Sequence, residues 1–214
     1  MECAMMVFVS GMAMAASLIV AIGPQNALLI RHGLAQVPTV FAIAGIFVAV
    51  DMVLISMGAL GVGSLVSQLP ELKLTLAAIA AAFFLYYGLS SLWRGIVGGN
   101  DDGLLQPATA GSAYGSAIAV SIANPGVLFD TVVLVGGLAS RYGDLGTRMV
   151  FSSGAVAASL LWFSTLAATS YLAGRYVKGT TVWRVLDIGL GVLMVILAAK
   201  LTSDVMALAR IVMV

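Results

Sequence analysis

Long apolar stretches, separated by short polar segments, run through this chain. They lack the two-residue alternation that is typical of membrane strands, and they therefore predict helices. A helix needs about 20 residues to cross a bilayer core of roughly 30 Å, since each residue adds about 1.5 Å. We predict an all-α bundle of six transmembrane helices. Five of the spans cover about residues 4–29, 38–63, 74–93, 113–138 and 149–172.

The sixth span is the shortest of the predicted spans. Its charge-free run, 188–199, reaches crossing length only if Arg184 and Asp187 join the helix. At a spacing of three residues these side chains share one helix face, where we expect them to neutralise each other near the headgroups. The alternative is a protein with five spans and a C-terminal helix on the membrane surface.

A polar, glycine-rich segment divides the chain. Residues 98–103 form its most polar stretch, and such sequences are typical of loops. We predict two three-helix halves, 1–97 and 113–214, joined by a linker at 98–112. An odd number of spans in each half would make the halves an inverted repeat, as in many alternating-access carriers. The ten Lys and Arg residues divide equally between the two predicted sides, so the positive-inside rule leaves the orientation open.

Composition supports an integral membrane protein and excludes several functions. Hydrophobic residues make up 61% of the 214 residues and charged residues only 9%, against roughly 25% in soluble domains. A net charge of +1 argues against nucleic acid as a partner and leaves the lipid bilayer as the expected one. One Cys and one His cannot form a thiol redox pair or, unaided, a transition-metal cage. We expect no enzyme activity, no cofactor and no metal site, and the sequence leaves open whether the chain forms a homo-oligomer.

The first predicted span is interrupted by Gly23, Pro24, Gln25 and Asn26. Proline has no N–H, so the carbonyl of Val20 loses its helical partner and the proline ring pushes the helix open. An interrupted helix at membrane depth is tolerated where it lines a cavity or is buried in protein. This segment is therefore a candidate for substrate binding.

The fourth predicted span carries a matching break at Asn124, Pro125 and Gly126, which frees the carbonyl of Ser121. Paired breaks in corresponding spans of two halves point to the substrate site of a transporter. Freed carbonyls attract an ammonium group and half-helix N-termini attract a carboxylate, which are the two groups of every α-amino acid. The alternative interpretation is that the two prolines only kink their helices.

Two acids, Asp51 and Asp130, lie well inside predicted spans. An ionised carboxylate at the bilayer centre costs roughly 2.5–3.5 kcal/mol, so such acids usually face a polar interior and serve a function. Each acid has a glycine seven residues later, Gly58 and Gly137, where close helix approach would turn the acid inward. We expect both acids to bind the substrate and to serve proton or ion coupling, because low dielectric favours a carboxyl group that can take up a proton. A structural hydrogen bond is the alternative.

Other polar and aromatic residues near the span ends are interpreted as surface or packing residues. Arg31 and His32, after the first break, would mark the membrane surface. Tyr86 and Tyr87 would belong to an aromatic belt, and Trp162 would pack.

The chain also resembles a known family. The segment Ile22-Gly23-Pro24-Gln25-Asn26 is similar to the signature of the LysE/ArgO family of bacterial basic amino-acid exporters, and so is Asn124-Pro125 followed by Asp130. Further similar stretches fall in the family's order at 142–144, 159–163 and 182–184. The resemblance covers nearly the whole chain. It implies a multi-pass carrier of the bacterial inner membrane that expels L-lysine or L-arginine, energised by the membrane potential or an ion gradient.

Two departures from the family pattern affect the substrate. Leu128 stands where the lysine and arginine exporters commonly carry a Tyr, and Asp187 occupies a position that is usually not acidic there. The alternatives are an exporter of neutral amino acids and a cation or metal permease in which Asp51 and Asp130 coordinate the ion.

Overall fold

The computed structural model describes residues 2–20, 23–62, 70–97, 110–122, 125–176 and 180–212. Within these ranges every regular element is a helix, as expected for an all-α protein. The elements are α1 (Glu2–Ile19), α2 (Pro24–Leu34), α3 (Thr39–Met57), η1 (Gly58–Val62), α5 (Pro70–Val97), α6 (Ala110–Ile122), α7 (Pro125–Leu128), η2 (Phe129–Val135), α8 (Gly136–Ala139), α9 (Leu145–Gly174) and α10 (Thr180–Val212). The segment η2 is π-helical, whereas η1 contains a kink at Gly61, whose φ is 107°.

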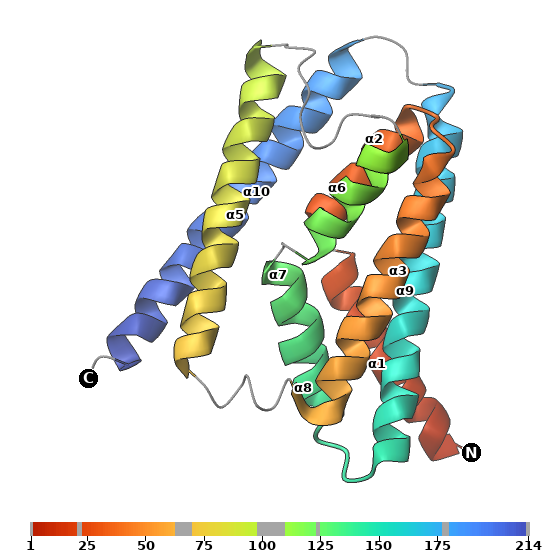
Figure 1. Ribbon diagram of the computed structural model, residues 1–214, viewed down its shortest axis with the longest axis vertical. Helices are drawn as coiled ribbons and strands as arrows, with labels where there is room; N and C mark the ends of the chain where they lie inside the picture. The colour runs from red at the N-terminus through yellow and green to blue at the C-terminus, as the bar shows by residue number, and fades with distance from the viewer. Residues whose placement is uncertain are drawn as a thin grey trace.

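The helices lie along the long axis of the molecule (Figure 1). The pair α1 and α2, then α5 and α9, run in one direction, and α3, the series α6 to α8 and α10 run back. Both chain ends lie at the same end of the bundle. Segment 98–109, which holds most of the predicted linker, lies outside the described residues, and α6 begins at Ala110.

Three helical stretches in the described part of the chain are long and apolar enough to cross a membrane. They are Thr39–Gly61, Leu145–Gly174 and Thr181–Ser203. A fourth candidate is the pair Ala4–Ile19 and Pro24–Leu34, if this pair, bent by 76°, counts as one span. Helix α5 covers the predicted third span, and α6 to α8 cover the predicted fourth.

The uncertain sixth span is continuous. Arg184 and Asp187 both lie inside α10, which runs unbroken from Thr180 to Val212. The stretch Thr181–Ser203, which includes both of these charged residues, meets the length needed for crossing. This result favours a crossing helix over one that lies on the surface.

Glycines bring α1 and α9 into backbone contact. A Cβ atom on Gly11 would lie 1.9 Å from the carbonyl oxygen of Phe151, and one on Gly154 would lie 2.0 Å from that of Phe8. Such close approach is how helices associate in lipid, where apolar burial gives no driving force. Helix α9 thereby becomes the central support of the bundle's first helices.

Glycine contacts also join η1 and α8. A Cβ on Gly58 would lie 2.8 Å from Cα of Gly136, so the predicted close approach after Asp51 is confirmed. The corresponding prediction for Gly137 is wrong, because a Cβ there would meet nothing within 4 Å. Asp130 lies within the π-helical η2, whose wider turns change the face on which a residue seven positions later falls.

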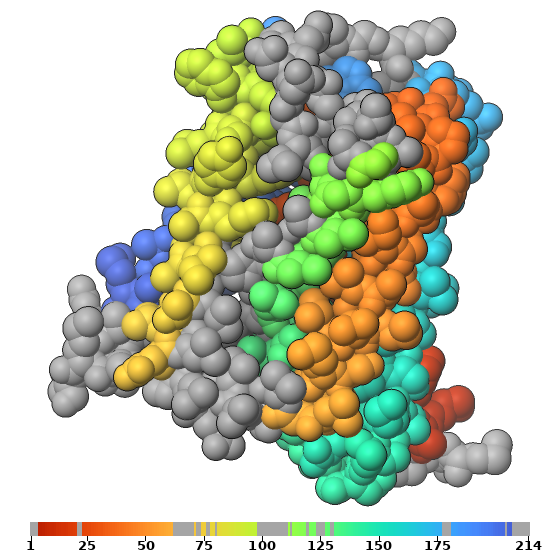
Figure 2. Space-filling view, viewed as in Figure 1, coloured from red at the N-terminus to blue at the C-terminus, as the bar shows by residue number. Residues whose placement is uncertain are grey.

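Helices α5 and α10 form a pair of their own. A Cβ on Gly191 would lie 2.9 Å from the Gly88 carbonyl oxygen, so the two backbones touch near the middle of the pair. Figure 2 shows side chains of α3 and α6 packed together, with α5 to one side of them. The pair is thus a unit whose side chains can meet those of α2 from one side.

Candidate functional site

The first break lies between Ile19 and Pro24. Gly23 is extended and Pro24 takes the first position of α2, where its missing N–H costs no hydrogen bond. The predicted break at 23–26 is therefore displaced, because Pro24, Gln25 and Asn26 form the first turn of α2 instead of interrupting it. The side-chain amide of Asn26 donates to the carbonyl of Ile19 at 3.0 Å, so Asn26 bridges the two half-helices.

A hydrogen bond joins described residues that flank the two breaks. Gln25 Nε2 donates to Ser121 Oγ at 3.0 Å, which joins the start of α2 to the last turn of α6. Ser121 in turn donates to the carbonyl of Ala117 at 2.9 Å, and both side chains of the first bond are buried. Asn124 lies outside the described residues, and Pro125 begins α7. The two interrupted helices thus contact each other through a polar bridge that runs between the two predicted halves.

Asp51 lies on α3 and is only 2% exposed. Its Oδ2 accepts a hydrogen bond of 2.6 Å from Ser159 Oγ on α9. Ser159 is a neutral partner, so this hydrogen bond solvates the carboxyl group without cancelling its charge. Asp130 is the second residue of η2, and its side chain lies outside the described part of the structure. A π-helical segment in a longer helix often marks a functional site.

Trp162 is a site residue that sequence reasoning missed. Its indole Nε1 donates to Asn26 Oδ1 at 3.1 Å, so it does more than pack. Trp162 follows Ser159 by three residues and therefore lies about one turn further along the same face of α9. One face of α9 thus holds both Asp51 and Asn26. The sequence signal was a polar residue and an indole at helical spacing inside an apolar span.

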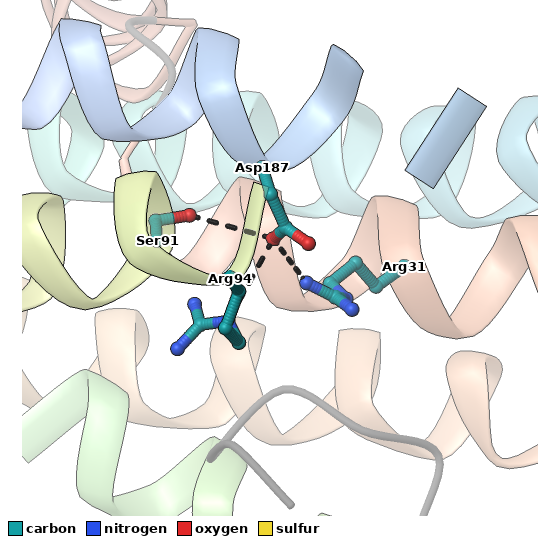
Figure 3. Close-up of polar contacts among 4 residues, drawn as sticks. All are labelled: Arg31, Ser91, Arg94 and Asp187. Atoms are coloured by element: carbon teal, nitrogen blue, oxygen red, sulfur yellow. Dashed lines mark hydrogen bonds and ion pairs between the residues drawn. The ribbon is translucent and has the colours of Figure 1, made fainter. Parts of the chain in front are cut away.

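A second polar cluster lies between α2, α5 and α10 (Figure 3). Asp187 accepts a hydrogen bond from Arg31 Nη1 and one of 3.4 Å from Ser91 Oγ, and Arg94 Nε lies 3.9 Å from the same oxygen. The ion-paired side chains of Arg31, Arg94 and Asp187 are 11%, 16% and 7% exposed. The three charged side chains of the cluster are therefore largely buried.

This cluster corrects two predictions. The expected pair of Arg184 with Asp187 does not form, because Asp187 turns inward to the two other arginines and Arg184 is exposed. Arg31 does not mark the surface, since it pairs with Asp187 and lies over the Trp183 ring at 5.8 Å. A charge inside the bundle is stabilised by a partner that is distant in sequence, which spacing along one helix cannot reveal.

Two more residues assigned to the surface are buried. His32 is fully buried, and its Nδ1 donates to the carbonyl of Leu28 at 2.9 Å. Tyr87 is 4% exposed, whereas Tyr86 is 67% exposed and fits the predicted belt. Tyr86 and Tyr87 are neighbours in sequence but lie on different faces of α5. One face of α5 packs inside the protein and the other is exposed.

The described residues contain no group of three His, Cys, Asp or Glu side chains that could hold a metal ion. The amides of Gln25 and Asn26 and the indole of Trp162 lie at the first helix break, and the buried carboxylate of Asp51 is bound about one turn away along α9. Such a set can bind a cationic or zwitterionic solute through charge and hydrogen bonds.

Comparison with known proteins adds evidence from the whole chain. A family model described as LysE type translocator matches residues 16–205. The chain is 31% identical to the lysine exporter LysE of Corynebacterium diphtheriae, over 92% of this chain and 99% of that protein. It is 29% identical to the lysine exporter LysE of Corynebacterium efficiens, over 92% and 98%, and 29% identical to the arginine exporter protein ArgO of Salmonella enteritidis, over 92% and 93%. No solved structure matches.

Proposed function

Because this chain belongs to the LysE type translocator family, we propose that it exports L-lysine, L-arginine or a related amino acid. It is a multi-pass protein of the bacterial inner membrane. The named relatives are lysine and arginine exporters, which supports amino-acid transport in place of catalysis. The membrane potential or an ion gradient would supply the energy.

The observation that carries the proposal is the buried Asp51, whose partner Ser159 lies about one turn of α9 from Trp162, the residue that donates to Asn26 at the first break. Its described hydrogen-bond partner is the neutral Ser159, so no described residue cancels the charge that the carboxylate carries when it is ionised. A guanidinium or ammonium group that enters low dielectric needs such a partner, since an unpaired buried charge is far too costly. A cationic amino acid therefore fits this site better than a neutral one.

The substrate site would form where the half-helices meet. In this proposal Gly23, Pro24, Gln25 and Asn26 line it from α2, and Asp51 lines it from α3. From the second half, three further residues would contribute: Asn124, Pro125 and Asp130. The hydrogen bond between Gln25 and Ser121 supports this arrangement, because it brings the two breaks within one side chain of each other. Asp51 and Asp130 would also carry the coupling proton or cation.

The arrangement of the helices supports six spans in two inverted halves. The helices before segment 98–109 run up, down and up, those after it run down, up and down, and both chain ends lie together (Figure 1). Halves inverted in this way allow a carrier to open alternately to either side around one central site. Six crossings would also require the bent pair α1 and α2, α5, and the series α6 to α8 each to cross the membrane.

Counterflow in proteoliposomes tests the proposal. Vesicles loaded with unlabelled arginine should accumulate labelled arginine or lysine from outside, because a carrier exchanges substrate without net energy input. Ion conductance without exchange would indicate a cation permease, and exchange of leucine but not of lysine or arginine would indicate a neutral amino-acid exporter. Either result would refute the proposed substrate class.

A further inference from the structure

The cluster around Asp187 contains more positive than negative charge. Arg31 and Arg94 both approach this one carboxylate, and all three side chains are at most 16% exposed. Among the described residues no second acid contacts the two arginines. A buried charge that lacks a partner destabilises a protein strongly, so a surplus guanidinium calls for an anion.

Several donors in the cluster have no acceptor among the described residues. They are Arg31 Nε, Arg94 Nε and Nη2, and the hydroxyl group of Tyr87, which precedes Ser91 by one turn on α5 and interacts electrostatically with Arg31, Arg94 and Asp187. All of these atoms are buried. Figure 3 shows the terminal nitrogens of Arg94 pointing away from Asp187. Buried donors are nearly always hydrogen-bonded, so these groups indicate a ligand that accepts several hydrogen bonds and carries a negative charge.

We propose that Arg31, Arg94 and Tyr87 hold the α-carboxylate of the transported amino acid, and that Asp187 positions the two arginines. A carboxylate is planar and accepts bidentate hydrogen bonds, which matches the fork of a guanidinium group. The inference rests on the proposed function in one respect, that the substrate is an amino acid. In this proposal the substrate carboxylate binds two guanidinium groups, each with a full positive charge. A half-helix N-terminus would offer only a partial charge of about +0.5.

The position of the cluster suits recognition of both ends of a cationic amino acid. Arg31 follows Asn26 by five residues on α2, a rise of about 7.5 Å. Asp51 lies on the other side of Asn26, since its partner Ser159 precedes Trp162 by about one turn of α9. The carboxylate and the side-chain cation of an extended lysine would thus bind near opposite ends of α2.

Binding of matched ligands to the purified protein tests the subsite. Lysine and lysinamide differ only in the carboxylate, and leucine and leucinamide form the same pair without the side-chain cation. The wild type should bind lysine about tenfold or more tightly than lysinamide, since a hydrogen bond to a charged group contributes about 1.5–3 kcal/mol. Leucine, which lacks the side-chain cation, should bind much more weakly than lysine but with the same preference over its amide. Arg94→Gln should abolish this preference. Tyr87→Phe, which removes one hydroxyl group and no apolar volume, should reduce it about threefold.

The exposed Arg184 provides the matched control, because it is an arginine of α10 outside the cluster. Arg184→Gln should keep the full preference. Equal affinity for acid and amide in the wild type would overturn the inference. So would equal weakening of both ligands by Arg94→Gln, as expected if Asp101 or Asp102, outside the described residues, neutralises the arginines. Preference for leucine over leucinamide without any lysine binding would support the subsite and refute the proposed cationic substrate.

Discussion

Asp51 and Asp187 are both buried carboxylates, but their surroundings suit them to different tasks. Asp187 is paired with Arg31 and lies close to Arg94, so its charge is neutralised within the protein. Asp51 accepts a hydrogen bond from a neutral hydroxyl group. Of these two acids, Asp51 is therefore the one suited to bind a cationic group of the substrate, and Asp187 the one suited to hold arginines in place.

Asp51→Asn should reduce lysine or arginine export at least about tenfold, because the loss of one charged hydrogen bond in low dielectric amounts to about 1.5–3 kcal/mol. The amide oxygen can still accept from Ser159, so the amount of protein in the membrane should not change. Efflux from loaded vesicles, normalised to protein amount, gives the rate. Glu71→Gln, at an exposed acid, is the control and should export normally. Efflux at the wild-type rate from the Asp51→Asn protein would refute the assignment of Asp51 to the substrate site.

Individual site residues were predictable where membrane burial makes them costly. Asp51 was predictable because an acid inside an apolar span is costly and is therefore expected to face the protein interior. The structure buries this residue. The Arg31–Asp187 pair was missed because its members are 156 positions apart and each lies near a predicted span end, where charges normally face water. Only packing of α2 against the α5 and α10 pair shows that these ends turn inward.

Helix breaks and glycine contacts give the elements their arrangement. Proline predicted that the first span is interrupted, but the break precedes Pro24 because proline is favoured in the first turn of a helix. The sequence predicted a close contact at Gly58 but placed its partner glycine at 137 instead of 136. The apolar pattern does not reveal the π-helical η2, which changes the face on which the later residues fall. Sequence patterns therefore predicted where the helices lie. They did not predict the exact position of the first break or the π-helical turns of η2, where the helical geometry changes.

Gly154→Ala should destabilise the protein by about 1–3 kcal/mol, the usual cost of an extra methyl group in a close-packed contact. The added Cβ would lie 2.0 Å from the Phe8 carbonyl oxygen, so α1 and α9 must separate. Thermal unfolding in detergent measures the change. Gly45→Ala is the matched control, because nothing lies within 4 Å of its Cβ position, and it should be neutral or stabilising. Equal stability of both variants would contradict the proposed contact.

The arrangement of the chain as a bundle follows from alternating helix directions, with both termini at one end (Figure 1). Six spans in two halves were predicted from the apolar stretches alone. The sequence could not give the orientation in the membrane, because positive charges are balanced between the two sides. Two of those charges, Arg31 and Arg94, are now placed inside the bundle and no longer count as loop charges.

Single-cysteine labelling tests the six-span topology. The chain has one cysteine, so Cys3→Ser gives a background for new cysteines at Gln36 and Gly143, two exposed residues in loops at opposite ends of the bundle. An impermeant thiol reagent should reach these two positions from opposite sides of the membrane. Tags on the N- and C-termini should share the side of Gly143. Termini on opposite sides would indicate an odd number of crossings and exclude the inverted repeat.

Competition for export tests the central claim, that buried acids select a cationic amino acid, most directly. Efflux of labelled arginine from proteoliposomes is measured with an excess of ornithine, canavanine, leucine or threonine in the same compartment as the arginine. Ornithine and canavanine should inhibit efflux, and leucine and threonine should fail to do so, because their side chains offer no cation to Asp51. Inhibition by leucine or threonine as strong as that by ornithine would contradict the claim and leave the acids as coupling groups only.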